Sequence, residues 1–328
     1  MSRRVVVLGT GGTIASRRDE RGAAAPTDAV AALLTGLDLG DVEVVARDLL
    51  AKDSSALTPA DQALIVREVQ VALGDPTVVG VVVTHGTDTA EETAYLLDLV
   101  HRDERPVVLT GAQRPADAPD ADGPGNLTDA LRVASDPAAR GLGVLVVFDG
   151  FVLAARGTRK VHTHEVTAFA QPDSGPLGRV EGGRLVVDGQ PAHREHPPVD
   201  LAGLASIRVD IAAVYPGVDG TALAAFAAAG ARGVVLVATG AGNANPAIVR
   251  AVEDLTRAGV VVGLTTRVDA GPVFAGYGGG GGGADLIDAG AVPLGTLRAG
   301  QGRILLLALL ASYDDAAAVR AAVPTFVG

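Results

Sequence analysis

The stretch Val83-Thr84-His85-Gly86-Thr87-Asp88-Thr89 completes an apolar run that begins at Val78. A buried strand that ends here delivers hydroxyls, an imidazole and a carboxylate to one point. The N-terminal run of residues 5–8 ends in a similar way, in Gly9-Thr10-Gly11-Gly12-Thr13-Ile14-Ala15. Because ligands of open α/β sheets bind at the carboxyl ends of the strands, these two threonine-rich strand ends predict a catalytic site built on hydroxyl nucleophiles.

Apolar β-branched runs alternate with alanine- and leucine-rich stretches through the first half of the chain. Strands are expected at residues 4–8, 42–46, 78–84, 106–110, 143–148 and 152–154, and helices at 59–73, 90–100 and 126–134. Thr58 is placed to cap the first of these helices, with Pro59 at its first position. The alternation predicts an α/β fold with a mostly parallel sheet that helices cover on both faces.

A second α/β pattern follows a segment that contains several prolines. Its expected strands are residues 209–214, 233–238 and 260–265, its expected helices are 221–229, 246–258 and 285–289, and residues 304–310 fit either a strand or a helix. We therefore predict an N-terminal domain of residues 1–190, a linker at 191–207 and a C-terminal domain of 208–328. One continuous sheet is the alternative.

The composition narrows the classes of function. The 328 residues include no cysteine, which excludes disulfides, thiol nucleophiles and cysteine-ligated metals. The formal net charge is −11 without a basic cluster, and 3% of residues are aromatic, so nucleic acid and anionic membranes are not expected partners. No apolar run reaches the roughly 18 residues of a membrane span, and the N-terminal run is too short for a signal peptide, so we expect a cytoplasmic protein.

Two segments are expected to be mobile. Residues 17–27 are charged and then rich in glycine and alanine, and they follow the first threonine turn, where a closing lid or a solvated loop would fit. Residues 278–283 are six consecutive glycines, which lose a large backbone entropy when they become ordered.

The two threonine motifs have catalytic and structural interpretations. The turn at residues 9–15 has Ile14 where a dinucleotide-binding fingerprint needs glycine, which argues against a dinucleotide site. Its backbone N–H groups would instead hold an oxyanion, or the segment is only a structural turn. Asp88 can bind a substrate ammonium group or orient a base, unless it or Thr87 caps the next helix. Lys160, if desolvated near Asp88, can remove a threonine proton, although a lone lysine is typical of the surface.

Three further polar groups leave alternatives open. Asp53-Ser54-Ser55 precedes a helix and can bind a carboxylate or form a turn and cap. His162 and His164 would lie on one face of a strand, but no third ligand is evident nearby, so no metal site is expected. Asn243 and Asn245 precede a helix and either cap it or contact a substrate.

Together these motifs resemble those of the bacterial-type L-asparaginase family. The matching segments are Thr10-Gly-Gly-Thr13-Ile-Ala15, Thr84-His-Gly-Thr-Asp-Thr89, Glu91-Glu-Thr-Ala-Tyr95, Gly111-Ala-Gln-Arg-Pro115, Asp122-Gly-Pro124 with Asn126-Leu127, and Lys160. Their joint order covers essentially the full chain. The resemblance implies a flavodoxin-like N-terminal domain, a smaller C-terminal α/β domain, hydrolysis of L-asparagine to L-aspartate and ammonia without metal or cofactor, and a homotetramer of intimate dimers.

Carried over by position, the resemblance implies roles for individual residues. Thr13 would attack the side-chain amide carbon, and water would hydrolyse the acyl-enzyme. Thr87, Asp88 and Lys160 would activate the nucleophile or the water. The Thr87 N–H and the region of Ala112 would place the amide and stabilise the oxyanion.

The resemblance also implies a set of substrate-binding residues, namely Ser54, Ser55, Gly86, Ala112, Asn243, Asn245 and Tyr277. Ser54 would bind the α-carboxylate and Asp88 the α-ammonium group. Family sites lie between the N-terminal domain of one subunit and the C-terminal domain of its partner, so Asn245, and less directly Asn243, would reach a neighbouring subunit's substrate.

The chain departs from the family pattern at three places. Residues 23–25 are alanines where the family commonly has a lid tyrosine, and Ser55 stands where many members have glutamine. Many members also supply a glutamate from the C-terminal domain of the partner subunit, but no glutamate lies near Tyr277 in this chain. We expect Tyr277, or another hydroxyl, to replace part of the hydrogen-bond network of the missing residues.

An asparaginase is the leading interpretation, with two alternatives. A glutaminase-asparaginase of broad specificity is one, because an added methylene is worth only ~1–3 kcal/mol of discrimination. A non-catalytic amino-acid binding protein is the other, which the missing tyrosine and glutamate favour. Retention of Lys160 beside two threonines argues against it, since binding alone needs no such base.

Overall fold

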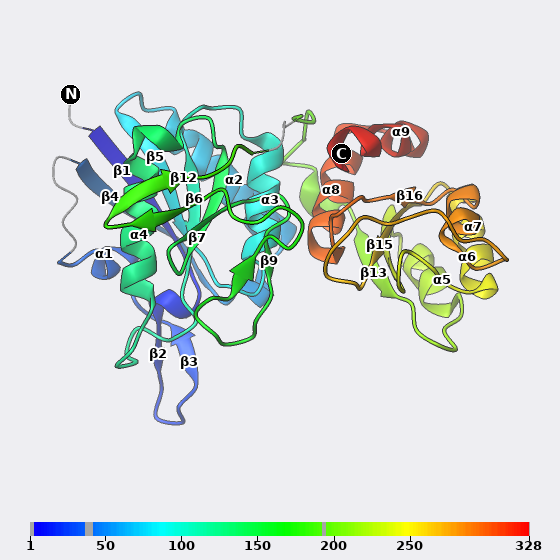
Figure 1. Ribbon diagram of the computed structural model, residues 1–328, viewed down its shortest axis with the longest axis horizontal. Coiled ribbons are helices and arrows are strands. Elements are labelled where there is room, and N and C mark those ends of the chain that lie inside the picture. The colour runs from blue at the N-terminus through cyan, green and yellow to red at the C-terminus, as the bar shows by residue number, and fades with distance from the viewer. Residues whose placement is uncertain (1–2, 37–41, 192–194, 328) are drawn as a thin grey trace. The chain divides into compact units, whose positions relative to one another are not determined.

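The computed structural model describes residues 3–36, 42–191 and 195–327 of the chain (Figure 1). It separates into two compact units, residues 1–193 and 194–328, which are described one at a time below. Residues 192–194 of the expected linker lie outside the described ranges.

An eight-stranded sheet with the strand order β12-β11-β8-β7-β6-β5-β1-β4 forms the centre of the N-terminal unit. Its strands are β1 (Arg3–Gly11), β4 (Val42–Lys52), β5 (Val78–Thr84), β6 (Val107–Thr110), β7 (Val144–Phe148), β8 (Phe151–Ala154), β11 (Gly178–Glu181) and β12 (Arg184–Val187). The neighbouring strands β7, β6, β5, β1 and β4 pair in parallel, and β8, β11 and β12 add antiparallel pairs. The predicted mostly parallel α/β fold is confirmed, and the parallel strands place their carboxyl ends at one edge.

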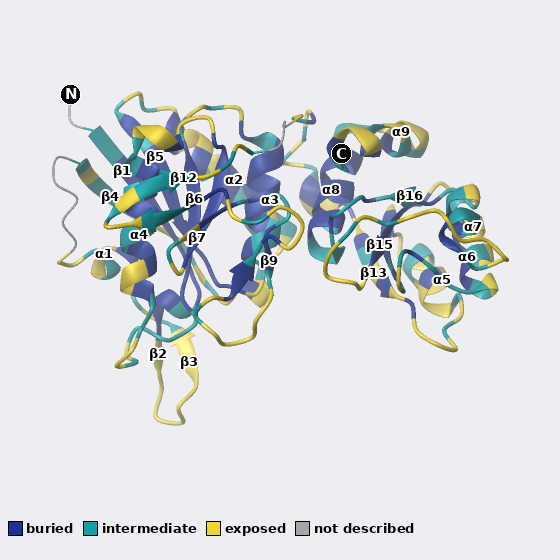
Figure 2. Ribbon diagram, viewed as in Figure 1, coloured by how far each residue is buried: buried dark blue, intermediate teal, exposed yellow. Residues whose placement is uncertain are grey.

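Helices cover both faces of this sheet. Helix α4 (Gly123–Ser135) packs on β5, β6 and β7, while α2 (Pro59–Leu73) and α3 (Ala90–Val100) contact each other and the same sheet from the opposite side. The strand residues between these layers are almost fully buried (Figure 2). As predicted, Thr58 caps α2: its hydroxyl accepts the Asp61 N–H at 3.2 Å.

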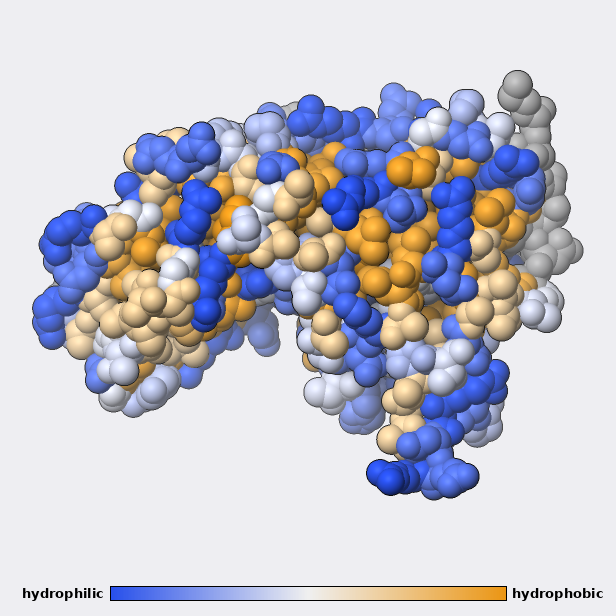
Figure 3. Space-filling view, turned by 180° about the vertical axis from the view of Figure 1, so that it is seen from behind, coloured by the Kyte–Doolittle hydropathy of each residue, from blue (hydrophilic) through white to orange (hydrophobic). Residues whose placement is uncertain are grey.

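A hairpin replaces the loop expected at residues 17–27. Strands β2 (Ser16–Arg18) and β3 (Ala24–Pro26) pair antiparallel, and the Asp28 N–H donates to the Ala15 carbonyl at 2.9 Å at the base. Most of the hairpin is exposed, and its projecting tip is hydrophilic (Figures 2 and 3). Strands of three residues without a β-branched side chain carry no periodic signal, which is why the pattern does not predict them.

The C-terminal unit has a four-stranded parallel sheet in the order β13-β14-β15-β16. Its elements are β13 (Val209–Ala213), β14 (Gly233–Ala238), β15 (Val261–Thr266), β16 (Val292–Pro293), α5 (Thr221–Ala228), α6 (Pro246–Arg257), α7 (Gly283–Asp288), α8 (Ala299–Ser312) and α9 (Ala316–Val327). Residues 304–310 belong to α8, which is apolar on all sides because it packs between the sheet and α9. Within the described ranges, no helix combines the length and apolarity needed to cross a membrane.

Candidate active site

The turn after β1 lies directly against the motif after β5. Gly11 and Gly12 have positive φ angles of 96° and 80°, a region that side chains disfavour. A Cβ on Gly12 would lie 2.4 Å from both the N and Cα atoms of Gly86, so the two backbones meet with no room for a side chain. Half-buried Thr13 follows this contact at the start of the 3-10 helix η1 (Thr13–Ala15).

Gly86 also contacts the predicted carboxylate-binding serine. A Cβ on Gly86 would lie 2.7 Å from Ser54 Oγ, and Ser54 is itself 4% exposed at the start of the 3-10 helix η2 (Ser54–Ala56). The Thr89 hydroxyl donates to the Ser54 carbonyl at 2.9 Å and ties η2 to the β5 motif. Ser55, in contrast, is exposed.

Lys160 joins the two polar residues that follow Gly86. Its Nζ donates to Thr87 Oγ1 at 2.8 Å and to Asp88 Oδ1 at 2.7 Å. Thr87 is 5% exposed, and Lys160 is not the freely solvated cation of the alternative interpretation. The N-cap of α3 is Thr89, whose side chain makes no capping bond, so neither Thr87 nor Asp88 serves as that cap.

Glu91 holds the backbone that carries Lys160. Lys160 lies on the short strand β9 (Arg159–Lys160), which pairs with β10 (Phe169–Ala170), and its N–H donates to the Glu91 carboxylate at 2.6 Å. Glu91 is half-buried, and burial raises its pKa to about 7. The sequence motif includes Glu91 without indicating this role. The available signal is its position four residues after Thr87 at the start of a helix.

His85 has a structural rather than an acid–base environment. The side chain is fully buried, and Nδ1 lies 2.7 Å from the Gly86 carbonyl, so Nδ1 carries the proton and donates. Burial lowers the pKa of His85 to about 4, which keeps the ring neutral near pH 7. Nε2 has no hydrogen-bond partner within the described part of the chain. His85 therefore holds the backbone of Gly86, the residue that lies against Gly12.

The loop after β6 is braced by two side chains of the next motif. The Asp122 carboxylate accepts the Gln113 N–H at 2.9 Å. The Asn126 amide donates to the Gly111 carbonyl at 3.0 Å. Between these anchors lies Ala112, which is fully buried. The motif that contains Asp122 and Asn126, which the sequence analysis identified only by its resemblance to the family, therefore holds the loop after β6 in place.

In the C-terminal unit, Asn243 and Asn245 both accept hydrogen bonds from backbone N–H groups of the same unit. Asn245 Oδ1 accepts the N–H groups of Ala247 and Ile248 at 2.9 and 3.0 Å, so it caps α6, and Asn243 Oδ1 accepts the Gly283 N–H at 3.2 Å. The capping alternative therefore describes Asn245. Tyr277 lies in a loop and is 56% exposed.

A possible third metal ligand lies next to the two histidines. The ligand atoms of His162, His164 and Glu165 lie within 4.8 Å of one another, and all three residues are exposed. However, His162 Nδ1 accepts the Glu165 N–H at 2.9 Å. A neutral ring in this arrangement carries its proton on Nε2 and has no lone pair left for a metal, so we assign no metal to the cluster.

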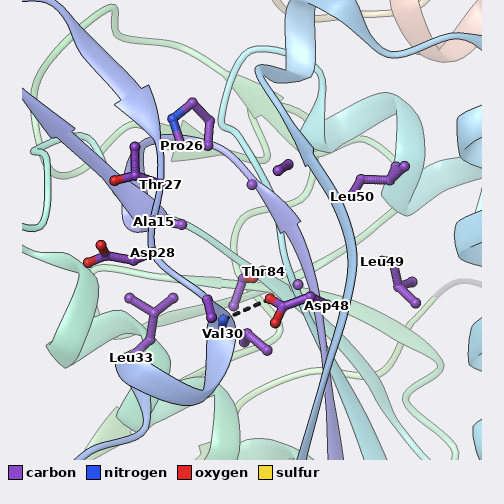
Figure 4. Close-up of a pocket in the computed structure, with 14 residues that line it drawn as sticks. Ala15, Pro26, Thr27, Asp28, Val30, Leu33, Asp48, Leu49, Leu50 and Thr84 are labelled. Carbon is purple, nitrogen blue, oxygen red and sulfur yellow. Dashed lines mark hydrogen bonds between the residues drawn. The ribbon is translucent and has the colours of Figure 1, made fainter.

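Two of the hollows in the described part of the N-terminal unit border the strand ends or Lys160. The first, about 350 Å³, is lined by strand ends and the base of the hairpin without Thr13, Thr87 or Lys160 (Figure 4). Its Asp48 carboxylate accepts the Val30 N–H at the start of α1 (Val30–Leu33) at 2.8 Å. The second, about 440 Å³, is lined by Lys160 together with Asp88 and Glu91, and it is the hollow that carries reactive groups.

Comparison with known proteins identifies the family. The model of the asparaginase N-terminal domain matches residues 4–193, and the model of the glutaminase/asparaginase C-terminal domain matches residues 208–323. The chain belongs to the asparaginase family. The resemblance predicted from the motifs is confirmed.

Named relatives of this family member extend along most of its length. A probable L-asparaginase of Deinococcus radiodurans is 40% identical over 322 residues, 95% of each chain. A glutaminase-asparaginase of Pseudomonas aeruginosa is 34% identical over 278 residues, 81% of this chain and 76% of the relative. The crystal structure of a probable cytoplasmic L-asparaginase from Campylobacter jejuni has a TM-score of 0.87 and 30% identity and covers 97% of this chain and 98% of that one.

Proposed function

We propose that this asparaginase-family protein hydrolyses L-asparagine to L-aspartate and ammonia through a threonine nucleophile. The observation that carries the proposal is the bonded set Lys160–Thr87–Asp88 at the end of β5. Gly86, one residue before this set, lies against Gly12, one residue before Thr13. A lysine that bonds a buried threonine beside a second threonine supports acyl transfer better than simple binding.

In the proposed acylation, the Thr13 hydroxyl oxygen attacks the side-chain amide carbon, and its proton passes to the Lys160–Thr87 pair. The tetrahedral intermediate places negative charge on the former amide oxygen, where the Thr87 N–H and the region of Ala112 would stabilise it. Collapse breaks the carbon–nitrogen bond, and the nitrogen leaves as ammonia after accepting a proton from the Lys160–Thr87 pair. Water then attacks the ester, with the same pair as the proton relay, and frees Thr13 and L-aspartate.

Two charged ends of the substrate have assigned partners in this proposal. The Ser54 hydroxyl, next to Gly86, would bind the α-carboxylate. Asp88 bonds Lys160 through Oδ1, and its carboxylate would also bind the α-ammonium group. Both contacts fix the amide near Thr13, which turns the attack into an intramolecular step.

Ammonia release from L-asparagine tests the proposal directly. We expect wild-type protein to release ammonia and Thr13→Ala to lose roughly 10³-fold or more of kcat. Thr35→Ala, which removes an exposed hydroxyl outside the site, is the matched control and should retain wild-type turnover. A folded wild type without turnover of any amide would indicate the binding-protein alternative. Full activity in Thr13→Ala would refute the assigned nucleophile.

A broader specificity is the second candidate function. It is favoured by the likeness to the Pseudomonas aeruginosa protein named glutaminase-asparaginase. One methylene is worth ~1–3 kcal/mol, so the kcat/KM values for asparagine and glutamine should differ by roughly 10–200-fold. Parallel assays with L-glutamine measure this ratio.

The homotetramer and the cytoplasmic location remain predictions. In the tetramer, Asn243, Asn245 and Tyr277 would contribute to a neighbouring subunit's site. Light scattering coupled to gel filtration would give the mass of the assembly, and cell fractionation would give its location. A monomer that is fully active would contradict the shared site.

A further inference from the structure

We propose that Gln113 is a positioning residue that sets the direction of the Thr87 hydroxyl proton and presents the oxygen lone pair of Thr87 to Lys160. The inference rests on the proposed function, because Thr87 and Lys160 are its proton relay. It assigns a role to a residue that belongs to a matched motif but that was expected neither to bind substrate nor to react.

The amide group of Gln113 can face only one way. Its Nε2 donates to the carbonyls of Glu165 and His162 at 3.2 and 3.4 Å. Carbonyl oxygens accept and never donate, so the NH₂ group must point toward them. The amide oxygen Oε1 therefore points the other way, where it accepts the Thr87 hydroxyl at 3.0 Å.

The backbone beneath this amide is also fixed. The Gln113 N–H donates to both oxygens of Asp122, at 3.1 and 2.9 Å. The Asn126 amide in turn donates to Asp122 Oδ2 at 3.2 Å. Gln113 thus connects the braced loop after β6 to the segment after β9, and it also bonds Thr87, which follows the end of β5.

The consequence for Thr87 follows from the count of its protons. A hydroxyl has one hydrogen, and here Gln113 accepts it. Lys160 Nζ, at 2.8 Å, must therefore donate into a lone pair of the Thr87 oxygen. In this state Lys160 is not placed to take the Thr87 proton, which favours Thr13 over Thr87 as the attacking group. In the proposed acylation, the Thr87 proton leaves Gln113 for the departing nitrogen while Lys160 supplies its replacement, and Lys160 then takes the proton that Thr13 loses.

Two substitutions at this position separate the direction of the hydroxyl from simple anchoring of the loop. Gln113→Met has a similar length but neither accepts from Thr87 nor donates to the carbonyls. Gln113→Glu keeps an acceptor for Thr87 and loses both donors. We expect Gln113→Met to lower kcat for ammonia release roughly tenfold, the scale of one hydrogen bond to a reacting group, with KM changed less than twofold.

We expect Gln113→Glu to keep at least half of the wild-type kcat at pH 8 and to lose activity with a new acidic limb as its carboxyl becomes protonated. Arg114→Met is the matched control, since that side chain bonds Asp120 outside the site, and it should retain wild-type kinetics. Thermal unfolding of each variant identifies any that fails to fold.

The outcomes distinguish this inference from the proposed function. If the wild type releases no ammonia, the proposed function fails. If the wild type is active and Gln113→Met is equally active, Gln113 does not position Thr87. Equal losses in folded Gln113→Met and Gln113→Glu would also overturn the inference, because they would assign the effect to the carbonyl anchors alone.

Discussion

The contact between Gly12 and Gly86 predicts a large penalty for a single methyl group. Gly12 has φ 80° and ψ −179°, a region that is essentially confined to glycine, so alanine there costs roughly 1–3 kcal/mol in backbone strain. The added Cβ would lie 2.4 Å from Gly86 N and Cα, and relieving such overpacking costs about 1–3 kcal/mol more. We therefore expect Gly12→Ala to lower the free energy of unfolding by about 2–6 kcal/mol, out of a typical 5–15.

Gly22→Ala separates the two contributions. Gly22 has φ 79°, but an added Cβ would meet no atom within 4 Å, so only the backbone cost of about 1–2 kcal/mol applies. Thermal unfolding monitored by circular dichroism measures both variants, and each 1 kcal/mol should lower Tm by roughly 2–4 °C in a unit of this size. Ammonia release should fall strongly in Gly12→Ala and stay unchanged in Gly22→Ala. Equal stability and equal activity of the two variants would refute the reasoning.

Three further predictions concern charged and capping residues. Lys160→Met should lower kcat by a factor of about 10²–10⁴, the contribution of general acid–base catalysis. Lys52→Met breaks only the 2.8 Å ion pair with Asp61 and should leave kcat unchanged. Equal losses of kcat in the two variants would contradict the assigned relay. Burial raises the pKa of Glu91 from 4.5 to about 7. Between these two pH values the folded protein binds more protons than the unfolded chain. Its free energy of unfolding should therefore fall by roughly 1–3 kcal/mol as the pH rises from 4.5 to 7. Glu91→Gln should abolish this loss in denaturant titrations at pH 5 and pH 8, and an unchanged pH dependence would contradict it. Asn245→Ala should cost about 1 kcal/mol through loss of the α6 cap, and Asn245→Asp should restore it; a rise in KM common to both would instead indicate substrate contact.

The parallel core of the N-terminal unit was predictable because its strands are continuous apolar runs. Residues 78–84, for example, are buried on both faces, so hydrophobicity alone marks them. Strand β4 was predicted to end at residue 46 but continues to Lys52, because an edge strand tolerates charged residues such as Arg47 that interrupt an apolar pattern. The antiparallel pair β11–β12 was missed because each strand has only four residues and includes a charged side chain that interrupts its apolar pattern.

The polar site was predictable where side chains cluster in sequence and not where they meet only in space. Thr87 and Asp88 are adjacent, so their shared chemistry was evident. The family resemblance had grouped Lys160 with these two residues, but its bonds to both, and the bond of Thr87 to Gln113, depend on how loops from different strands approach one another. Such contacts have no local periodicity, and the role of Glu91 in holding the Lys160 backbone is hidden for the same reason.

Lys160 follows Thr87 by 73 positions in the chain, and this separation has a consequence for biosynthesis. When the first 148 residues have been polymerised, the strands β1, β4, β5, β6 and β7 are complete in sequence, but the lysine of the relay has not yet been added. Translation at about 5–20 residues per second therefore adds the lysine within seconds of the last parallel strand. A product that ends after β7 would therefore contain the five parallel strands and Thr87 without the lysine that completes the relay.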